Sequence, residues 1–312
     1  MGYNHTPVLC EESIAYLNIN PDGVYVDCTL GGGGHAKRIA GQLAAGRLIG
    51  VDQDQAAVGA ASEALSAYRD RITIVRGNFS DIKGILASVN INRADGFLVD
   101  LGVSSYQLDN AERGFSYMHN AELDMRMDDR NQLTAYRVVN EYDEKRLAQI
   151  FFDYGEERCA KRIAKAIVKA RAQKPISTTF ELSDLVKSVL PKESKEGGSH
   201  PARRVFQSIR IHVNGELGIL DNALTDMIDL LNPRGRICVI SYHSLEDRIT
   251  KLCFRHWENP CECPPKLPCV CGRKPLVQVV TKKPVTPGEN EIAGNHRSRS
   301  AKLRVAEKLL CV

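Results

Sequence analysis

The chain has 312 residues, of which 43% are hydrophobic and 26% charged, a balance typical of a folded protein with one large domain or two smaller ones. No apolar run reaches the roughly 20 residues that span a bilayer, and the start of the chain lacks the pattern of a signal peptide, so we expect a cytoplasmic protein without a membrane partner. Ten cysteines in so long a chain argue against a disulfide scaffold. The net charge of +4 permits a nucleic-acid partner without requiring one.

The first hundred residues alternate between strand and helix patterns. We predict strands at Val24–Asp27, Arg47–Asp52, 72–75 and 96–100, with helices at 36–43, 56–68 and about 82–89. This alternation favours a parallel sheet covered by helices on both faces, in which a ligand binds at the carboxyl ends of the strands. Polar residues recur at these predicted ends, namely Asp27, Asp52, Asn78 and Asp100.

Residues 107–199 have no convincing strand pattern, and we predict that they form an inserted all-α domain. The helix predicted at 156–172 has one apolar face, while the rest of its surface is basic and carries Arg158, Lys161, Arg162, Lys165 and Lys169. These basic residues either form a solvated helix face or contact RNA phosphates. Thr178 and Glu181 match a capping box that opens a further helix, which Pro191 ends before a flexible loop at 192–199.

The remaining residues, 200–312, return to the sheet. We predict a long helix over 202–231, a turn over 232–236 and a fifth strand over 237–241. Two stretches with a period of two, 276–280 and 301–307, are expected to pair as antiparallel strands at the edge of the sheet. The prediction is therefore an α/β domain of residues 1–106 and 200–312, interrupted by the helical insertion of residues 107–199.

Four consecutive glycines at 31–34 follow the first strand and precede a helix, as in a loop that binds a nucleotide-type cofactor. The run formally matches the dinucleotide fingerprint, and Asp52 follows Gly33 by nineteen residues, as expected for an acid that binds ribose. Asp27, however, lies just before the glycines and would repel a pyrophosphate. It would suit the ammonium group of S-adenosylmethionine, which carries no phosphate and whose ribose diol can donate to Asp52. Phe79 fits either an adenine-facing surface or plain core packing.

Six motifs occur together and in order: His5-Thr6-Pro7-Val8-Leu9, Asp27-x-Thr29-x-Gly31-x-Gly33-Gly34-His35, Asp100-Leu101-Gly102-Val103-Ser104-Ser105, Arg113-Gly114-Phe115-Ser116, Leu123-Asp124-Met125-Arg126-Met127-Asp128 and Ser241-Tyr242-His243-Ser244-Leu245-Glu246-Asp247-Arg248. In this combination the chain closely resembles the bacterial small-subunit (16S) ribosomal RNA cytosine-N4 methyltransferase family, over nearly its whole length. Without the resemblance, the residues also leave open a dehydrogenase, a non-catalytic RNA-binding module, or a methyltransferase for DNA, protein or a small molecule.

The resemblance implies a class I methyltransferase (Rossmann-like) fold, which is a doubly wound seven-stranded sheet, here with an inserted helical domain for RNA recognition. It implies S-adenosylmethionine as methyl donor and, as substrate, a decoding-region cytidine of 16S rRNA within the small ribosomal subunit. No membrane partner is implied, and whether the chain forms a homodimer stays open. Carried over by position, the residues that contact the cofactor are Gly33, Gly34, His35, Asp52, Phe79, Asp100 and Gln107.

The exocyclic amine of cytosine is a weak nucleophile because its lone pair is delocalised into the ring, so an enzyme must supply an acceptor for its N–H and an in-line approach. Many amino-methylating enzymes use an Asp/Asn-Pro-Pro-aromatic loop after the fourth strand, and segment 100–105 replaces that loop here. We hypothesise that Asp100 touches the cofactor or the amine and that Ser104 supplies a hydroxyl acceptor. Tyr242 and His243 either contact the substrate or belong to a helix start capped by Ser244.

Four cysteines lie within eleven residues, in the pattern Cys261-x-Cys263 and Cys269-x-Cys271. Four thiolates suit a tetrahedral zinc ion, whereas the neighbouring prolines also fit a reduced loop that holds no metal. We assign no metal to the chemistry itself.

Overall fold

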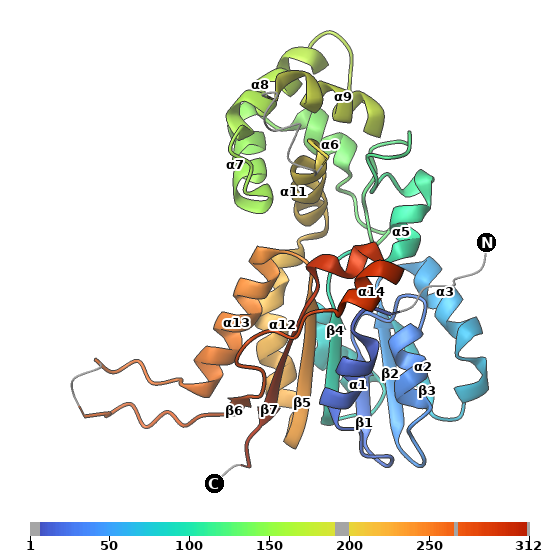
Figure 1. The fold of residues 1–312 in the computed structure, drawn as a ribbon, viewed down its shortest axis with the longest axis vertical. Coiled ribbons are helices and arrows are strands. Elements are labelled where there is room, and N and C mark those ends of the chain that lie inside the picture. Colours follow the sequence, from blue (N-terminus) through green and yellow to red (C-terminus); the bar gives the residue numbers. More distant parts are fainter. Residues whose placement is uncertain (1–6, 191–199, 265–267, 311–312) are drawn as a thin grey trace. The chain divides into compact units, whose positions relative to one another are not determined.

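The computed structural model describes residues 7–190, 200–264 and 268–310 (Figure 1). The chain forms two compact units, one made of Met1–Gly102 with Leu217–Val312 and the other of Val103–Glu216. The second unit includes all of the insertion expected at 107–199 and extends beyond it at both ends. It does so because the helix Arg203–Asn214 packs on the helix Glu144–Gly155, and both therefore belong to one hydrophobic core.

The first unit is built on a seven-stranded sheet whose strands lie in the order β3-β2-β1-β4-β5-β7-β6. The parallel part consists of β1 (Val24–Asp27), β2 (Arg47–Asp52), β3 (Ile72–Arg76), β4 (Ala94–Asp100) and β5 (Leu231–Ser241). The antiparallel pair is β7 (Lys302–Lys308), which joins β5, and β6 (Val277–Val279), which forms the edge. The predicted α/β class and the predicted antiparallel edge pair are both confirmed.

Helices cover both faces of this sheet because neighbouring residues along each strand point to opposite sides. Tyr25 and Leu98 pack on one face with α1 (Cys10–Leu17) and α2 (Gly34–Ala40). Val26 and Phe97 pack on the other, against helices that include α4 (Ile82–Ser88), α12 (Glu216–Leu230) and α13 (Ser244–Glu258). The sheet is therefore doubly wound.

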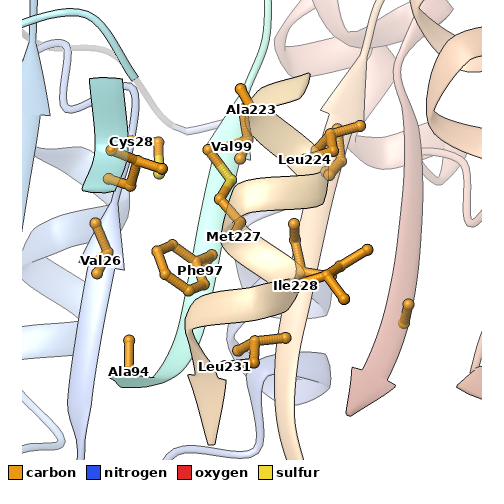
Figure 2. Packing of buried hydrophobic residues seen from close by; sticks show 14 of the residues in the cluster. Val26, Cys28, Ala94, Phe97, Val99, Ala223, Leu224, Met227, Ile228 and Leu231 are labelled. Carbon is orange, nitrogen blue, oxygen red and sulfur yellow. The ribbon is translucent and has the colours of Figure 1, made fainter. Parts of the chain in front are cut away.

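Figure 2 shows this core where α12 packs against the middle of the sheet. Met227 of α12 and Phe97 of β4 are both fully buried, and their side chains lie together between the helix and the strands. Each such side chain stabilises the fold by about 1.5–3 kcal/mol when it leaves water. The neighbours of this pair are Val26, Cys28, Ala94, Val99, Ala223, Leu224, Ile228 and Leu231.

Several predicted helices differ from the observed ones in their limits, and the one predicted at 36–43 is α2, which begins and ends earlier. The stretch predicted as one helix over 202–231 is two helices, α11 (Arg203–Asn214) and α12, because Gly215 between them has a φ of 63° and ends α11 in the left-handed region. The helix predicted at 156–172 begins later, as α8 (Ala160–Arg171), since Glu156 ends the preceding helix with a φ of 48°. The helix predicted at 56–68 is α3 (Gln55–Ala64) followed by the 3-10 turn η1 (Ser66–Tyr68).

The fifth strand also begins earlier than predicted. β5 starts at Leu231, which pairs with Ala94, and the next pair is Arg236 with Gly96. The residues between these two pairs bulge out of the strand and include Arg234 at a φ of 66°. The predicted turn over 232–236 is therefore an irregularity inside a longer strand.

The second unit is helical, and within its described residues only an isolated bridge, between Glu122 and Thr178, has β-type pairing. Its helices are α5 (Ser105–Asp109), η3 (Ala111–Arg113), α6 (Ala135–Glu141), α7 (Glu144–Gly155), α8, α9 (Thr179–Val189) and α11. The amphipathic prediction for α8 is confirmed, since Ile163 and Ile167 are fully buried. The capping box of α9 is confirmed as well, because Thr178 Oγ1 accepts from the N–H of Glu181 and Glu181 Oε2 accepts from the N–H of Thr178.

Two further sequence predictions fall partly or wholly outside the described residues. Pro191, predicted to end the helix after Thr178, and the loop predicted at 192–199 both lie there, as do the first two residues of the motif that starts at His5. No helix of the described part of the chain has both the length and the apolar character that a membrane span requires.

Candidate active site

The chain order of the sheet reverses between β1 and β4. From β1 the chain continues outward through β2 and β3, and it then returns to the other side of β1 to form β4 and β5. At such a switch point the loops diverge above the strand ends and leave a crevice for a ligand. Asp27 is the last residue of β1 and Asp100 the last of β4, so these two carboxyl groups flank this point.

The glycine run after β1 makes the turn into α2. Gly31 and Gly33 have φ values of 51° and 80°, a region that side chains disfavour. A Cβ on Gly33 would also lie 3.1 Å from the side chain of Leu65, and one on Gly34 would collide with Pro7. Glycine is therefore required here both by the backbone conformation and by the close packing around the loop.

Asp52, at the end of β2, is tied to this glycine loop. Its Oδ2 accepts from the N–H of Gly31 at 2.8 Å and its Oδ1 from the N–H of Asp54 at 2.9 Å. Burial raises the pKa of Asp52 to about 6, although both of these hydrogen bonds favour the charged form. Each oxygen has a second lone pair, so the carboxylate suits the hydroxyl donors of a ribose.

Asp27 is buried, with 1% of its surface exposed. Its Oδ1 accepts from the N–H of Thr29 at 3.2 Å, while its Oδ2 has no hydrogen-bond partner. Burial raises the pKa of Asp27 to about 7, and the neighbouring charge of Asp52 acts in the same direction. A buried carboxyl oxygen without a donor beside a glycine loop fits a cationic ligand, such as one with an ammonium or a sulfonium group, and does not fit a phosphate.

Asp100 joins three elements of the first unit. Its backbone N–H donates to Thr29 Oγ1 at 2.6 Å, and its Oδ1 accepts from the hydroxyl of Tyr242 at 2.8 Å. Burial raises the pKa of Asp100 to about 7, and the hydrogen bond from Tyr242 opposes this effect. Burial together with Asp100 raises the pKa of Tyr242 well above its usual value, so this phenol stays neutral and donates.

His35 lies on α2 beside Asp100. Its Nε2 is 3.0 Å from the carbonyl oxygen of Val8, and since a carbonyl only accepts, Nε2 carries a hydrogen. Its Nδ1 is 3.9 Å from Oδ2 of Asp100. The ring therefore presents Nδ1 toward the carboxyl group at the end of β4.

His243 begins α13, and its side chain caps that helix. Its Nδ1 accepts from the N–H of Glu246, and Glu246 Oε2 accepts from the N–H groups of Tyr242 and His243 at 2.8 and 3.3 Å. The helix start expected at Ser244 is therefore capped one residue earlier, by His243. Glu246 is buried and fixes the backbone of Tyr242, a positioning role that the sequence analysis missed and that the His-x-x-Glu spacing could have signalled.

Phe79 follows β3 in the 3-10 turn η2 (Phe79–Asp81). Asn78 caps this turn by accepting from the N–H of Ser80, and it donates to Gln53 Oε1 at 2.7 Å, which links the ends of β3 and β2. The ring of Phe79 is half-buried and packs against the core under the sheet. Phe79 therefore packs against the core with part of its side chain, and the rest of the side chain is exposed.

Ser104 and Gln107 belong to the second unit, where they form the capping box of α5. The hydroxyl of Ser104 accepts from the N–H of Gln107 at 3.2 Å, and Gln107 Oε1 accepts from the N–H of Ser104 at 3.0 Å. The fold therefore brings Asp27, His35, Asp52, Asp100 and Tyr242 to the strand ends of the first unit, and it joins Ser104 and Gln107 separately in the second.

This sheet order, with the antiparallel strand β7 between β5 and β6, and with carboxyl groups and a glycine loop at the ends of the parallel strands, is that of a class I methyltransferase. Residues 2–309 match the model of the MraW methylase family, and the chain belongs to this family. It is accordingly a methyltransferase whose cofactor is S-adenosylmethionine.

Three relatives are similar over the whole chain. The chain is 53% identical to ribosomal RNA small subunit methyltransferase H of Lachnospira eligens, over 99% of each chain. It is 55% identical to ribosomal RNA small subunit methyltransferase H 2 of Agathobacter rectalis, again over 99% of each. The protein named methyltransferase H in Clostridioides difficile is 53% identical, over 99% of this chain and 100% of the relative. A solved rRNA methylase from Streptococcus thermophilus is only distantly similar, at 11% identity and a TM-score of 0.41, over 96% of this chain and 94% of that one.

Proposed function

We propose that this enzyme transfers a methyl group from S-adenosylmethionine to the exocyclic N4 amine of a cytidine in the decoding region of 16S rRNA. The substrate would be the RNA within the small ribosomal subunit, in the cytoplasm. The relatives' names support an rRNA of the small subunit. The single observation on which we base the reaction type is the Tyr242–Asp100 hydrogen bond at the end of β4, because a carboxyl group held there could accept the N–H of an amine.

The cofactor would be bound mainly by residues of the first unit. Asp52 would accept from the ribose hydroxyls, the loop of Gly33 and Gly34 would admit the amino-acid part of the cofactor, and Asp27 would face its positive charge. His35 and Phe79 are proposed as further contacts, with the exposed part of the Phe79 ring against the adenine. From the second unit, Gln107 is proposed as an additional contact, as the family resemblance implies. When bound, S-adenosylmethionine supplies an electrophilic methyl group on a cationic sulfur.

Asp100 is proposed to accept the N–H of the cytosine amine, which makes the amine lone pair more available for attack. Tyr242 holds this carboxyl group through its hydroxyl, and Glu246 holds the backbone of Tyr242. His243, as the cap of α13, is proposed to act by positioning Tyr242. Ser104 is proposed to contribute a hydroxyl acceptor.

The RNA would contact the basic residues of α8 and of the segment just before it, namely Arg158, Lys161, Arg162, Lys165 and Lys169. All five side chains are exposed, and none has an acidic partner within the described part of the chain. By contrast, Lys174 pairs with Glu181 at 2.8 Å and Lys187 with Asp184 at 3.3 Å. Unpaired cations at this spacing favour contact with phosphates. Basic residues near the end of the chain, Lys282, Lys283, Arg297 and Arg299, are further candidates.

The test is methyl transfer to small subunits isolated from cells that lack the enzyme, with nucleosides identified by mass spectrometry. We expect N4-methylcytidine in the wild-type reaction and its loss with Asp100→Ala at unchanged subunit binding. Methylation of a different base or atom, or full turnover by Asp100→Ala, would contradict the proposal. For the RNA surface, Lys161→Glu/Lys165→Glu should weaken subunit binding and its salt dependence while cofactor affinity stays the same, with Lys251→Glu, an exposed lysine of α13, as the matched control.

A further inference from the structure

A loop of the first unit brings four cysteines together. The loop connects the end of α13 at Glu258 with the start of β6 at Val277, and it is closed where the N–H of Leu276 donates to the carbonyl oxygen of Trp257 at 2.9 Å. The ligand atoms of the four cysteines all lie within 4.8 Å of one another, and these residues are Cys261, Cys263, Cys269 and Cys271. Two of them come from the outgoing arm of the loop and two from the returning arm.

We propose that these four cysteines bind one zinc ion as thiolates and that this ion holds the two arms of the loop together. The thiol protons would pass to solvent when the ion binds. The site would be structural, because four protein ligands complete a tetrahedral coordination shell and leave no position for water or substrate.

Three of the sulfurs lie at separations close to those of a tetrahedral zinc site, and all four lie within 4.8 Å of one another. A tetrahedron of sulfurs about 2.3 Å from a central zinc has edges of about 3.8 Å. The observed Sγ–Sγ distances are 3.5 Å for Cys261–Cys269, 3.5 Å for Cys269–Cys271 and 3.8 Å for Cys261–Cys271. These separations are too long for disulfide bonds of about 2.05 Å. The N–H of Val270 also donates to the sulfur of Cys263 at 3.4 Å, a contact that favours a thiolate.

The loop has little else to hold it in this shape. No described residue between 261 and 275 is buried, and Val270 is 88% exposed. Apart from the cysteines, the arms are joined by Arg273, which pairs with Glu262 and donates to the carbonyl of Pro260 at 3.5 Å. Exposed ion pairs of this kind contribute little. A metal cross-link would therefore stabilise the conformation of this loop, as the hydrophobic core stabilises the rest of the unit.

The site lies far from the chemistry. α13 begins beside Tyr242 and has 15 residues, so its two ends are about 22 Å apart at 1.5 Å per residue. The described parts of the cysteine loop, up to residue 264 and from residue 268 on, extend from the far end of this helix away from the sheet (Figure 1). Removal of the ion should therefore leave cofactor binding unchanged.

The experiment measures zinc in the full chain, purified with reductant and without a polyhistidine tag, by mass spectrometry of the elements. We expect about one zinc per chain in the wild type, and almost none in Cys261→Ser/Cys271→Ser. Cys159→Ser is the matched control, because Cys159 lies outside the cluster at the start of α8, where serine is a good cap. Cobalt substituted for zinc should show the charge-transfer bands of tetrahedral thiolate coordination in the wild type and lose them in the double variant.

Circular dichroism and binding of S-adenosylmethionine serve as checks that the double variant is folded. The proposal is overturned if the reduced wild-type protein takes up no zinc from a chelator-buffered solution, or if the double variant retains the same zinc content. It is also overturned if the isolated protein carries iron in place of zinc, or if its four cysteines are found as two disulfides.

Discussion

The affinity for S-adenosylmethionine should weaken when the pH falls from 8 to 6. Burial raises the pKa values of Asp27 and Asp100 to about 7, so both carboxyl groups change their charge within this window. A cationic ligand favours the ionised carboxylate, and the carboxyl groups are increasingly protonated, hence neutral, below pH 7. Because the carboxyl groups are partly protonated in the free protein, they should take up fewer protons when the cationic cofactor is bound.

The magnitude follows from the fraction of ionised carboxylate. With a pKa of about 7, this fraction is about 0.9 at pH 8 and about 0.1 at pH 6, so the affinity should fall about tenfold if one carboxyl group must be ionised. If both must be ionised, the fall should be about a hundredfold. Asp52, with a pKa of about 6, contributes only near the lower end of the range.

Isothermal titration calorimetry in buffers of different ionisation enthalpy measures both the affinity and the protons released. Asp27→Asn should bind more weakly at pH 8 and lose part of the pH dependence. An affinity that stays constant between pH 6 and 8, or one that rises on acidification, would refute the reasoning.

Three further predictions concern stability and turnover. Asp27→Asn should stabilise the protein without cofactor. The pKa of Asp27 is raised in the folded state, so the folded protein is progressively destabilised as the pH rises from about 4 to 7 and the buried carboxyl group ionises. The gain in the free energy of unfolding at pH 8 is bounded by about 4 kcal/mol; urea unfolding at pH 5 and 8 measures it, and an equal effect at both pH values would argue against this reasoning. Tyr242→Phe removes the donor to Asp100. Loss of a hydrogen bond to a charged group should lower kcat by about 10- to 100-fold. Single-turnover kinetics test this, and an unchanged rate would exclude the positioning role. Met227→Ala leaves a cavity between α12 and the sheet and should lower the free energy of unfolding by about 2–5 kcal/mol. Met118 is exposed, so Met118→Ala should lower it by almost nothing, and equal losses in the two variants would contradict the packing argument.

Local patterns in the sequence predicted much of the fold. The alternation of strand and helix, together with the acids at 27, 52 and 100, predicted a candidate site at one edge of the sheet, because the carboxyl ends of parallel strands meet there. The capping box of Thr178 and Glu181 was predictable because its hydrogen bonds join residues three apart. The break at Gly215 was missed, since a single glycine within a helical pattern does not reveal its backbone conformation.

The sequence by itself thus determined the order of the elements, the glycine loop, and the residue types at the strand ends, all of which depend on near neighbours in the chain. The tertiary structure alone decided which side chains meet. Tyr242 donates to Asp100 across 142 residues, and Glu246 holds Tyr242 in place only because α13 begins at this edge of the sheet. The four cysteines approach one another because Trp257 and Leu276 close their loop. Contacts between distant residues depend on how whole elements pack, and the periodicity within a single element does not predict them.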